Sequence, residues 1–320
     1  MKVEKIAAIP LDKATAKKYA AIIVKEQFGQ TAEKIKYLGG GSFGRAFKIE
    51  LAGGKKLVVK FLRANDMLEK ETYDLRLLAD NCPVKIPQVL FARNADSKIP
   101  VDCYGMENIE GKNAFMSFGM LVLGKRKRLE FAEKVTSALH RIHCRTNEKF
   151  GDTLAPDCLT WVDYYKPFAK AVLDKAEQLY RAKNISEKII VAMRAAWDKF
   201  DIIFSENVQE ACLIHGDLNI ANIMIDKKHC LSGFIDPLNS MYADREYDLF
   251  QFDNLTGKRF FLRETYTKKY GASKFCDLKC AFYGLWNEVY CYIKSGVLIG
   301  FIINPLVKNM HRQLKNLNAT

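Results

Sequence analysis

The stretch LIHGDLNIANIMI at residues 213–225, closed by FIDP at 234–237, decides how this chain is interpreted. Apolar runs on both sides of a polar loop predict a strand, a tight loop and a second strand. The loop carries Asp217 and Asn222, and Asp236 follows a third apolar run, Leu231–Ile235. A loop aspartate or asparagine can simply serve a turn. That alternative explains one such residue more easily than an ordered set of three.

The three residues have the chemistry that phosphoryl transfer needs. Asp217 can accept or orient the proton of an attacking hydroxyl. The side-chain oxygen of Asn222 and the carboxylate of Asp236 are hard ligands of the kind that Mg²⁺ prefers on a nucleotide. We expect His215 to hydrogen-bond the loop as a scaffold and not to act as the base.

A glycine-rich turn lies between two strand-like runs near the N-terminus. Its residues are Gly39, Gly40, Gly41, Ser42, Phe43 and Gly44. Glycines let backbone N–H groups approach phosphate oxygens, although many hairpins are also glycine-rich. No Gly-Lys-Ser/Thr closes the turn, so it is not a Walker A loop. The strand–turn–strand context predicts a flap over nucleotide phosphates.

Lys60 lies inside the short apolar strand Leu57–Phe61. Period-two geometry places it on the face opposite Leu57, Val59 and Phe61. One interpretation is an edge-strand lysine that reaches water. The other is a cation for the α- and β-phosphates, held by a glutamate of the next helix. Glu71 is favoured for that role because it sits one turn before inward Leu75, and Glu69 stays open.

The pattern of predicted elements is segregated. Helices are expected at 13–27 and 67–80, and strands at 35–38, 45–51, 57–61, 88–93 and from 104. Residues 125–210 and 240–315 read as mostly helical, with short strands between 208 and 235. This predicts an α+β fold with an N-terminal lobe at 1–107 and a C-terminal lobe at 108–320.

Bulk composition predicts a globular protein. The chain has 320 residues, of which 49% are hydrophobic, and a net charge of +13. The lysines are spread along the chain, so we interpret most of the charge as solvated surface and expect neither nucleic acid nor a membrane as partner. The densest run, Lys125–Arg128, is expected to be an exposed loop or a helix start. Residues 289–303, too short and too interrupted to span a membrane, are expected to form a buried helix or helix pair.

The compartment is predicted from the cysteines and the N-terminus. Nine cysteines without a C-x-x-C pair favour reduced thiols. No signal peptide is evident in Met1–Pro10. We therefore expect a cytoplasmic protein, as a monomer or a homodimer.

The run His-Gly-Asp-Leu-(x)3-Asn-Ile-Met followed by Ile-Asp-Pro resembles the aminoglycoside phosphotransferase superfamily. This group includes antibiotic kinases, choline kinases and fructosamine kinases, all built like eukaryotic protein kinases. The segments Leu139–His143 and Tyr242–Leu249 are similar to this superfamily too, and the run from Asp236 to Leu249 looks closest to fructosamine kinases. The resemblance implies a bilobal protein-kinase-like fold with a small antiparallel-sheet N-lobe and a mostly helical C-lobe.

The resemblance also implies roles for individual residues. It makes Asp217 the catalytic base, Asn222 and Asp236 the Mg²⁺ ligands, and Lys60 with Glu71 the phosphate site. A hinge would meet adenine through its backbone, and its residues are Met106, Glu107, Asn108 and Ile109. Asp248 would brace the catalytic loop without touching substrate.

Two departures from these relatives matter. The flap and the run Val58–Phe61 look more like general antibiotic kinases than fructosamine kinases. The Asp-Phe-Gly of protein kinases is Ile235-Asp236-Pro237 here, and no long activation loop separates Asp236 from Asp248. A small-molecule acceptor is therefore favoured over a protein.

The expected function is ATP- and Mg²⁺-dependent phosphorylation of a hydroxyl on an aminoglycoside-, fructosamine- or choline-like molecule. The alternatives are a nucleotide-binding protein of this fold without catalysis, a protein kinase, and a nucleic-acid-binding protein. The side chains that contact the acceptor are expected to come from the helical region. The candidates are Trp161, Asp163, Tyr164, Tyr165, Trp286, Glu288 and Tyr292. The two tryptophans are equally well explained as core.

Overall fold

The computed structural model describes residues 3–319; residues 1, 2 and 320 of the predicted lobes lie outside that part. The chain divides into two compact units. The sheet unit comprises Ile6–Gly111 and Ser232–Ile235. The helical unit comprises Lys112–Leu231, the chain from Asp236 onward, and a short N-terminal segment that ends at Lys5. The segment 232–235 joins the sheet unit because the N–H of Phe234 donates to the carbonyl of Lys85 at 2.9 Å.

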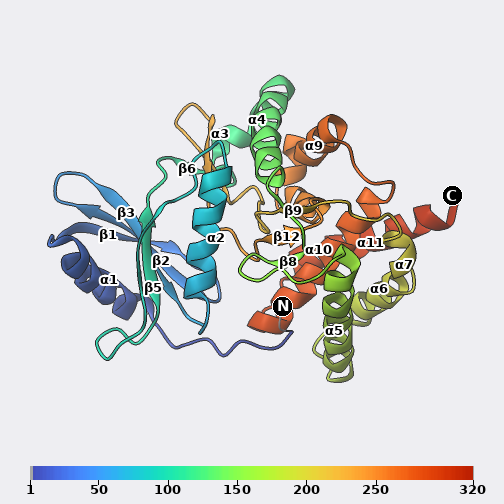
Figure 1. The fold of residues 1–320 in the computed structure, drawn as a ribbon, viewed down its shortest axis with the longest axis horizontal. Helices are drawn as coiled ribbons and strands as arrows, with labels where there is room; N and C mark the ends of the chain where they lie inside the picture. The colour runs from blue at the N-terminus through green and yellow to red at the C-terminus, as the bar shows by residue number, and fades with distance from the viewer. Residues whose placement is uncertain (1–2, 320) are drawn as a thin grey trace. The chain divides into compact units, whose positions relative to one another are not determined.

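The sheet unit is built on one antiparallel sheet of order β1-β2-β3-β5-β4 (Figure 1). Its elements in chain order are α1 (Lys13–Phe28), β1 (Ala32–Gly39), β2 (Gly44–Leu51), β3 (Lys56–Leu62), α2 (Leu68–Asn81), β4 (Val89–Arg93), β5 (Cys103–Glu107) and the end of β11 (Leu231–Phe234). The helices and strands expected in this part of the chain are confirmed.

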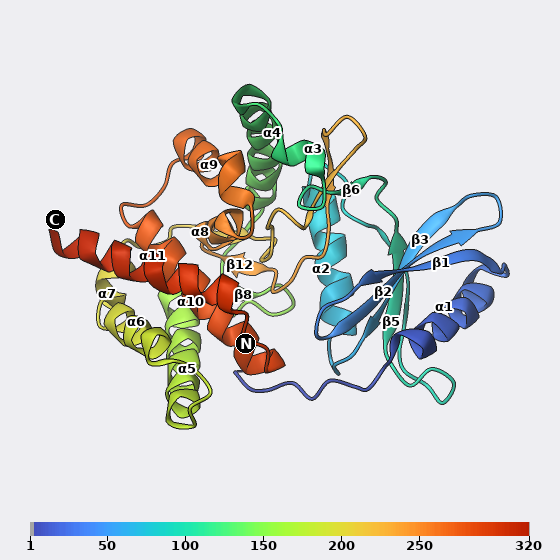
Figure 2. The ribbon, with the colours of Figure 1, turned by 180° about the vertical axis from the view of Figure 1, so that it is seen from behind.

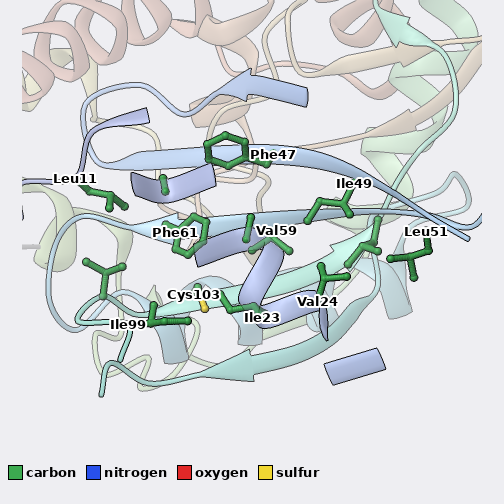
Figure 3. Packing of buried hydrophobic residues seen from close by; sticks show 14 residues of the cluster. Leu11, Ile23, Val24, Phe47, Ile49, Leu51, Val59, Phe61, Ile99 and Cys103 are labelled. Atoms are coloured by element: carbon green, nitrogen blue, oxygen red, sulfur yellow. The ribbon is translucent and has the colours of Figure 1, made fainter. Parts of the chain in front are cut away.

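Alternation along β3 builds the core of this unit. Leu57, Val59 and Phe61 are completely buried and face the apolar stripe of α1, which includes Ile23 and Val24 (Figure 3). Helix α1 starts at a side-chain cap: the carboxylate of Asp12 accepts hydrogen bonds from the N–H groups of Ala14 and Thr15. It ends at Gly29, whose φ of 66° suits a residue without a Cβ.

The helical unit combines long helices with short strands. Its helices are α3 (Phe118–Leu121), α4 (Lys125–His143), α5 (Trp161–Arg181), α6 (Glu187–Trp197), α7 (Phe200–Ile203), α8 (Glu246–Leu249), η1 (Phe250–Asp253), η2 (Gly257–Phe260), α9 (Leu262–Tyr270), α10 (Cys276–Ser295) and α11 (Gly300–Ala319). Its strands are β6 (Lys112–Asn113), β7 (Thr146–Asn147), β8 (Gly151–Asp152), β9 (Ala211–Leu213), β10 (Ile223–Ile225) and β12 (Met241–Ala243).

The apolar stretch at 289–303 forms parts of a helix pair, as expected, but it is not buried throughout, because Val297 and Phe301 are 58% and 76% exposed. Helix α10 ends at Gly296 in the left-handed conformation, and α11 returns beside it (Figure 2). Among residues 3–319, no helix is long and apolar enough to cross a membrane. The basic run Lys125–Arg128 is the first turn of α4, in which Lys125, Arg126 and Lys127 are exposed and Arg128 is half-buried.

The segment between α4 and α5 differs from the expected helical pattern. Strands β7 and β8 interrupt it, and they pair with β9 and β12 respectively. Thr146 lies opposite Cys212, and Asp152 lies opposite Met241. Such two-residue strands depend on partners far along the chain, so local periodicity does not reveal them.

Trp161 and Trp286 belong to the aromatic core of the helical unit. The indole N–H of Trp161 donates to the hydroxyl of Tyr283 at 2.8 Å, and that of Trp286 donates to the carbonyl of Ala169 at 2.9 Å. Phe282 stacks on Trp286 with ring centroids 3.7 Å apart. Both tryptophans are therefore structural residues, in agreement with the alternative interpretation that they belong to the core.

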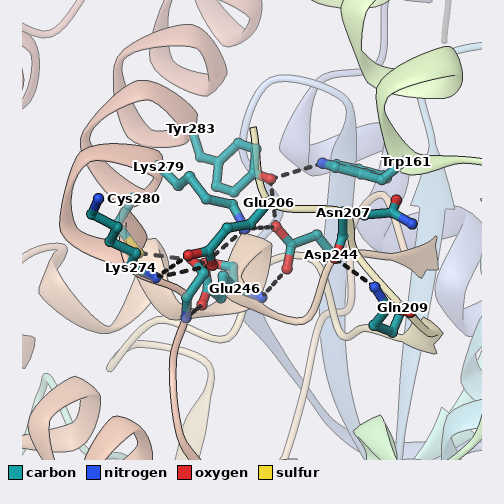
Figure 4. A network of polar contacts seen from close by, with 11 residues as sticks. Trp161, Glu206, Asn207, Gln209, Asp244, Glu246, Lys274, Lys279, Cys280 and Tyr283 are labelled. Carbon is teal, nitrogen blue, oxygen red and sulfur yellow. Dashed lines mark hydrogen bonds and ion pairs between the residues drawn. The ribbon is translucent and has the colours of Figure 1, made fainter. Parts of the chain in front are cut away.

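A buried ionic cluster crosses this core (Figure 4). The ammonium of Lys279 lies 2.5 Å from Asp244 and 2.8 Å from Glu246. Tyr283 donates to Asp244, and the N–H and hydroxyl of Ser273 donate to Glu246. Burial alone would lower the pKa of Lys279, but the two carboxylates outweigh it and raise that pKa. The cluster ties the start of α10 to the chain around α8.

We expect Lys279→Met to lower the free energy of unfolding by about 3–5 kcal/mol, because two carboxylates stay buried without their cation. Urea denaturation followed by circular dichroism measures this. Lys274→Met is the matched control: its side chain is exposed, and the change should cost less than about 0.5 kcal/mol. Equal stability of the two variants would contradict the structural role of the cluster.

Candidate functional site

In the sheet unit, Lys60 and Glu71 form an ion pair. The ammonium of Lys60 lies 2.9 Å from the carboxylate of Glu71, and both side chains are almost fully buried. Strand β3 is the central strand of the sheet, so the edge-strand interpretation of Lys60 does not hold. Glu69, the other glutamate considered for this pair, is exposed.

Tyr104 completes this pair and was not found by sequence reasoning. Its hydroxyl donates to Glu71 at 2.8 Å. Tyr104 lies opposite Lys60 in the β3–β5 ladder, so both side chains project from the same face of the sheet. The signal is present in the sequence only if the register of β3 and β5 is known.

The glycine-rich turn connects β1 to β2 and lies against Lys60. A Cβ on Gly44 would lie 3.4 Å from the Lys60 side chain and only 2.7 Å from the carbonyl oxygen of Gly40, and a Cβ on Gly40 would lie 2.5 Å from the carbonyl carbon of Gly44. Glycine is therefore required at both positions. Arg45 and Arg63 hold the turn through the carbonyls of Gly41, Ser42 and Gly44.

The four predicted hinge residues lie at the end of β5 and just beyond it. The N–H of Glu107 donates to the carbonyl of Gln88 at 2.9 Å, and Ile109 is buried. Met106 pairs with Val58 in the sheet. The side chain of Asn108 donates to Glu110 at 3.1 Å.

In the helical unit, the loop between β9 and β10 carries Asp217. Its two carboxylate oxygens accept hydrogen bonds from the amide groups of Asn219 and Asn222, at 2.9 and 3.0 Å. Asn222 also donates to the backbone carbonyl of Asp217 at 2.7 Å. Asn219 was missed by sequence reasoning, because an asparagine two residues after an aspartate is equally typical of an ordinary turn.

Asp217 is surrounded by groups that oppose its charge. Burial raises its pKa first, and the nearby negative charge of Asp236 raises it further. The amide donors of Asn219 and Asn222 lower it only in part, so the pKa is raised to about 7. A carboxylate in this state is suited to exchange protons near neutral pH.

Asp248 anchors the loop between β9 and β10 through hydrogen bonds. The N–H groups of His215 and Gly216 donate to its two oxygens at 2.8 and 2.7 Å. His143, from the segment Leu139–His143, places its Nε2 at 3.1 Å from the same carboxylate. Gly216 has φ of 80°, and a Cβ there would lie 2.2 Å from the carbonyl oxygen of Leu238. The contacts of Asp248 are those that a brace of this loop requires.

His215 is buried and has a structural position. Its ring Nδ1 accepts the N–H of Asp217 at 3.4 Å, and its carbonyl accepts the hydroxyl of Ser240 at 3.0 Å. These contacts connect Asp217 to Ser240, which follows Asp236 in the chain. The backbone of Asp236 has a φ of 55°. A positive φ is uncommon outside glycine and is found at functional sites.

The residues expected to hold Mg²⁺ fit that ion by chemistry. The amide nitrogen of Asn222 is used by Asp217, which leaves its oxygen to face the other way. Asp236 is exposed at the end of β11. Within residues 3–319 no cluster of three His, Cys, Asp or Glu side chains is found that could hold a metal alone. One amide and one carboxylate suit Mg²⁺, which keeps water and takes further oxygens from phosphates.

A cavity of about 400 Å³ opens beside Asp217. Its walls come from the catalytic loop, η1 and the chain after it, α10 and α11. The lining residues are Asp217, Asn219, Phe250, Gln251, Asp253, Asn254, Leu255, Lys258, Cys280, Gly284, Asn287, Glu288, Cys291, Phe301, Ile302, Pro305, Leu306 and Asn309. Of the seven side chains suggested for acceptor contacts, Glu288 alone is in this lining. Tyr292 instead donates to the carbonyl of Asn184.

We expect the carboxyl group of Asp217 to titrate near pH 7, protonated below and charged above. Carbon-detected NMR of the nucleotide-free protein, assigned with Asp217→Asn, measures this. Asn219→Ala removes a donor that favours the charged form and should raise the midpoint, whereas Asn287→Ala elsewhere in the cavity should not. A wild-type midpoint near pH 4 would contradict the burial of this carboxylate.

Comparison with known proteins was made for sequence and for fold. Residues 34–273 match the model of the phosphotransferase enzyme family. Among curated proteins, none matches the sequence.

Solved structures with the same fold cover almost the whole chain. A protein described as a fructosamine-3-kinase from Thermobifida fusca has a TM-score of 0.65 and 19% identity, over 92% of this chain and 98% of its own. A thermostable mutant of aminoglycoside phosphotransferase APH(4)-Ia with AMP-PNP and hygromycin B has a TM-score of 0.68 and 18% identity, over 94% of this chain and 99% of its own.

The GDP complex of wild-type aminoglycoside 2′-phosphotransferase-IIIa has a TM-score of 0.68 and 17% identity, over 94% of this chain and 99% of its own. These similarities confirm the expected α+β, protein-kinase-like fold. Since the family model spans more than half of the 320 residues, the chain belongs to the phosphotransferase enzyme family.

Proposed function

We propose that this protein is an ATP- and Mg²⁺-dependent kinase that phosphorylates a hydroxyl group of a small polar molecule. The observation that carries the proposal is the position of Asp217. Its carboxylate is fixed by two amides and lines a cavity of about 400 Å³. That volume suits a drug- or sugar-sized acceptor. A hydroxyl that enters the cavity meets the one carboxylate whose pKa is raised to about 7.

The sheet unit would bind the nucleotide. Lys60 is oriented by Glu71 and lies beside the glycine-rich turn, so a cation and a flexible flap occur together. Met106, Glu107, Asn108 and Ile109 would meet adenine through the backbone. Mg²⁺ on Asn222 and Asp236 would neutralise phosphate charge, which is most of what a loose phosphoryl transition state requires.

The carboxylate of Glu288 supports an acceptor that carries an amine. Burial raises the pKa of Glu288, and no ion pair to it is found within the described residues. Asp253 also lines this cavity and lies outside the loop of Asp217. Its carboxylate is already paired with Arg263 at 2.9 Å. A cationic acceptor group would offset the cost of burying Glu288.

Two alternatives are less well supported. A nucleotide-binding protein without catalysis would not need Asp217 held beside a cavity. A protein kinase would need an open surface for a peptide, whereas this cavity is formed between helices.

The nine cysteines are unpaired, which supports the reducing cytoplasm as the compartment.

We expect Asp217→Ala to lower Mg²⁺-dependent ATP turnover at least about a hundredfold, because the proton acceptor is lost. A coupled assay over aminoglycosides, fructosamine-type sugars, choline-like amines and amino alcohols first identifies the acceptor. Nucleotide binding, measured by calorimetry, should persist in the variant.

Asp201→Ala, an exposed aspartate on α7, is the control and should keep full activity. Full turnover in Asp217→Ala would overturn the assignment of the base. Failure of every acceptor with the wild-type protein, together with intact ATP binding, would favour the protein without catalysis.

We expect Glu288→Gln to raise the KM of an amine-bearing acceptor by about 10- to 100-fold, because a charge-assisted hydrogen bond is lost. The KM for ATP should not change. Asp277→Asn, an exposed change on the same helix, is the control. An unchanged acceptor KM in Glu288→Gln would show that the amine is bound elsewhere.

A further inference from the structure

Large apolar side chains are exposed together at helix α3. Phe118, Met116 and Val122 are 76%, 71% and 66% exposed. Phe118 is the first residue of the helix and Val122 follows its last residue, Leu121, whereas Met120 between them is completely buried. A single exposed apolar residue is ordinary, but three within seven residues form a patch that calls for a partner.

Positive charge adjoins this patch. Helix α4 begins at Lys125, and Lys125, Arg126 and Lys127 in its first turn are all exposed. That turn contains no acidic residue, although the N-terminus of a helix already carries positive potential. Arg126 pairs with Glu130 one turn later. The arrangement costs helix stability unless an anionic partner offsets the repulsion.

Two further elements add basic residues beside α3. A Cβ on Gly119 would meet the ring of His229, so the turn after β10 that carries exposed Lys227 and Lys228 lies against the helix. The guanidinium of Arg259 donates to the carbonyl of Leu121 at 3.3 Å. Figures 1 and 2 both show this turn beside α3 at the outer end of α4.

We propose that the α3 surface, defined as Met116, Phe118, Val122, Lys125, Arg126 and Lys127, docks on an anionic phospholipid membrane. Exposed apolar side chains would enter the boundary between head groups and acyl chains, and the basic residues would meet lipid phosphates. The sequence led us to expect no membrane partner. Peripheral docking through a folded surface is a different mode from a spanning helix and leaves no long apolar segment.

The chemistry of the surface favours lipid over two other partners. A second copy of this chain, related by a two-fold axis, would bring Lys125 to Lys127 close to the same residues of the partner. Single-stranded nucleic acid would use stacked aromatic rings. Met116 and Val122, two of the three exposed apolar side chains of this surface, cannot stack, but they gain from leaving water.

Flotation with vesicles tests the proposal on the full chain. We expect binding to vesicles of phosphatidylcholine with roughly one third phosphatidylglycerol, weak binding to phosphatidylcholine alone, and a loss of binding as salt rises. Phe118→Ser/Val122→Ser and Lys125→Glu/Lys127→Glu should each weaken binding at least about tenfold. All of these side chains are exposed, so melting temperatures should stay unchanged.

Matched changes elsewhere separate this surface from the overall charge. Leu159→Ser removes another strongly exposed apolar side chain, and Lys188→Glu/Lys308→Glu makes the same change in charge. Both controls should bind like wild type. Phe118→Trp, made together with Trp197→Phe, should show a blue-shifted emission with anionic vesicles, because Trp161 and Trp286 are already buried and the half-buried Trp197 is removed.

Several results would overturn the proposal. One is the absence of binding to anionic vesicles at low salt. Another is an equal loss in the control charge variant with no effect of Phe118→Ser/Val122→Ser, which indicates general attraction only. A dimer in solution that the apolar variant dissociates would assign the surface to a second copy. Binding of single-stranded RNA, lost in both variants without vesicle binding, would assign it to nucleic acid.

Discussion

The loop between β9 and β10, which carries the proposed base, depends on one buried carboxylate. Asp248 is completely excluded from solvent and accepts hydrogen bonds from two consecutive backbone N–H groups, those of His215 and Gly216. A buried carboxylate without such donors would be strongly unfavourable, so the loop and the carboxylate stabilise each other. His143 contributes a third contact from α4 and is itself held by the hydroxyl of Tyr266 at 2.6 Å. The position of Asp217, the next residue in the loop, follows from this arrangement.

Carboxylates in this protein differ mainly in what surrounds them. Glu71 has a lysine and a tyrosine hydroxyl, and Asp244 has a lysine and a tyrosine hydroxyl. Asp217 is buried beside the negative charge of Asp236 and has two neutral amides as donors, and burial first and that charge second raise its pKa to about 7. The same chemical group thus serves structure where a cation accompanies it, as in Glu71 and Asp244, or where backbone N–H groups donate to it, as in Asp248. Asp217 has neither and is suited to proton transfer.

Much of the fold and of the candidate site was accessible from local patterns. The stripe of α1 and the alternation along β3 were predicted correctly because each depends on the period of one element. Strands β7 and β8 were not, because they exist only through pairing with β9 and β12. The same limit explains why Tyr104 was missed. Its relation to Lys60 is a matter of register between two strands separated by about forty residues.

The sequence by itself determined which residues we propose for the chemistry, since Asp217, Asn222, Asp236 and Lys60 are recognised by residue type and order. Tertiary structure alone decided what surrounds them. It paired Lys60 with Glu71, which the sequence had favoured over Glu69, placed Trp161 and Trp286 in the core, and brought Glu288 to the cavity beside Asp217. The physical reason is that charge, burial and cavity shape arise from segments that meet only when the chain is folded. Local sequence patterns do not show which distant segments come into contact.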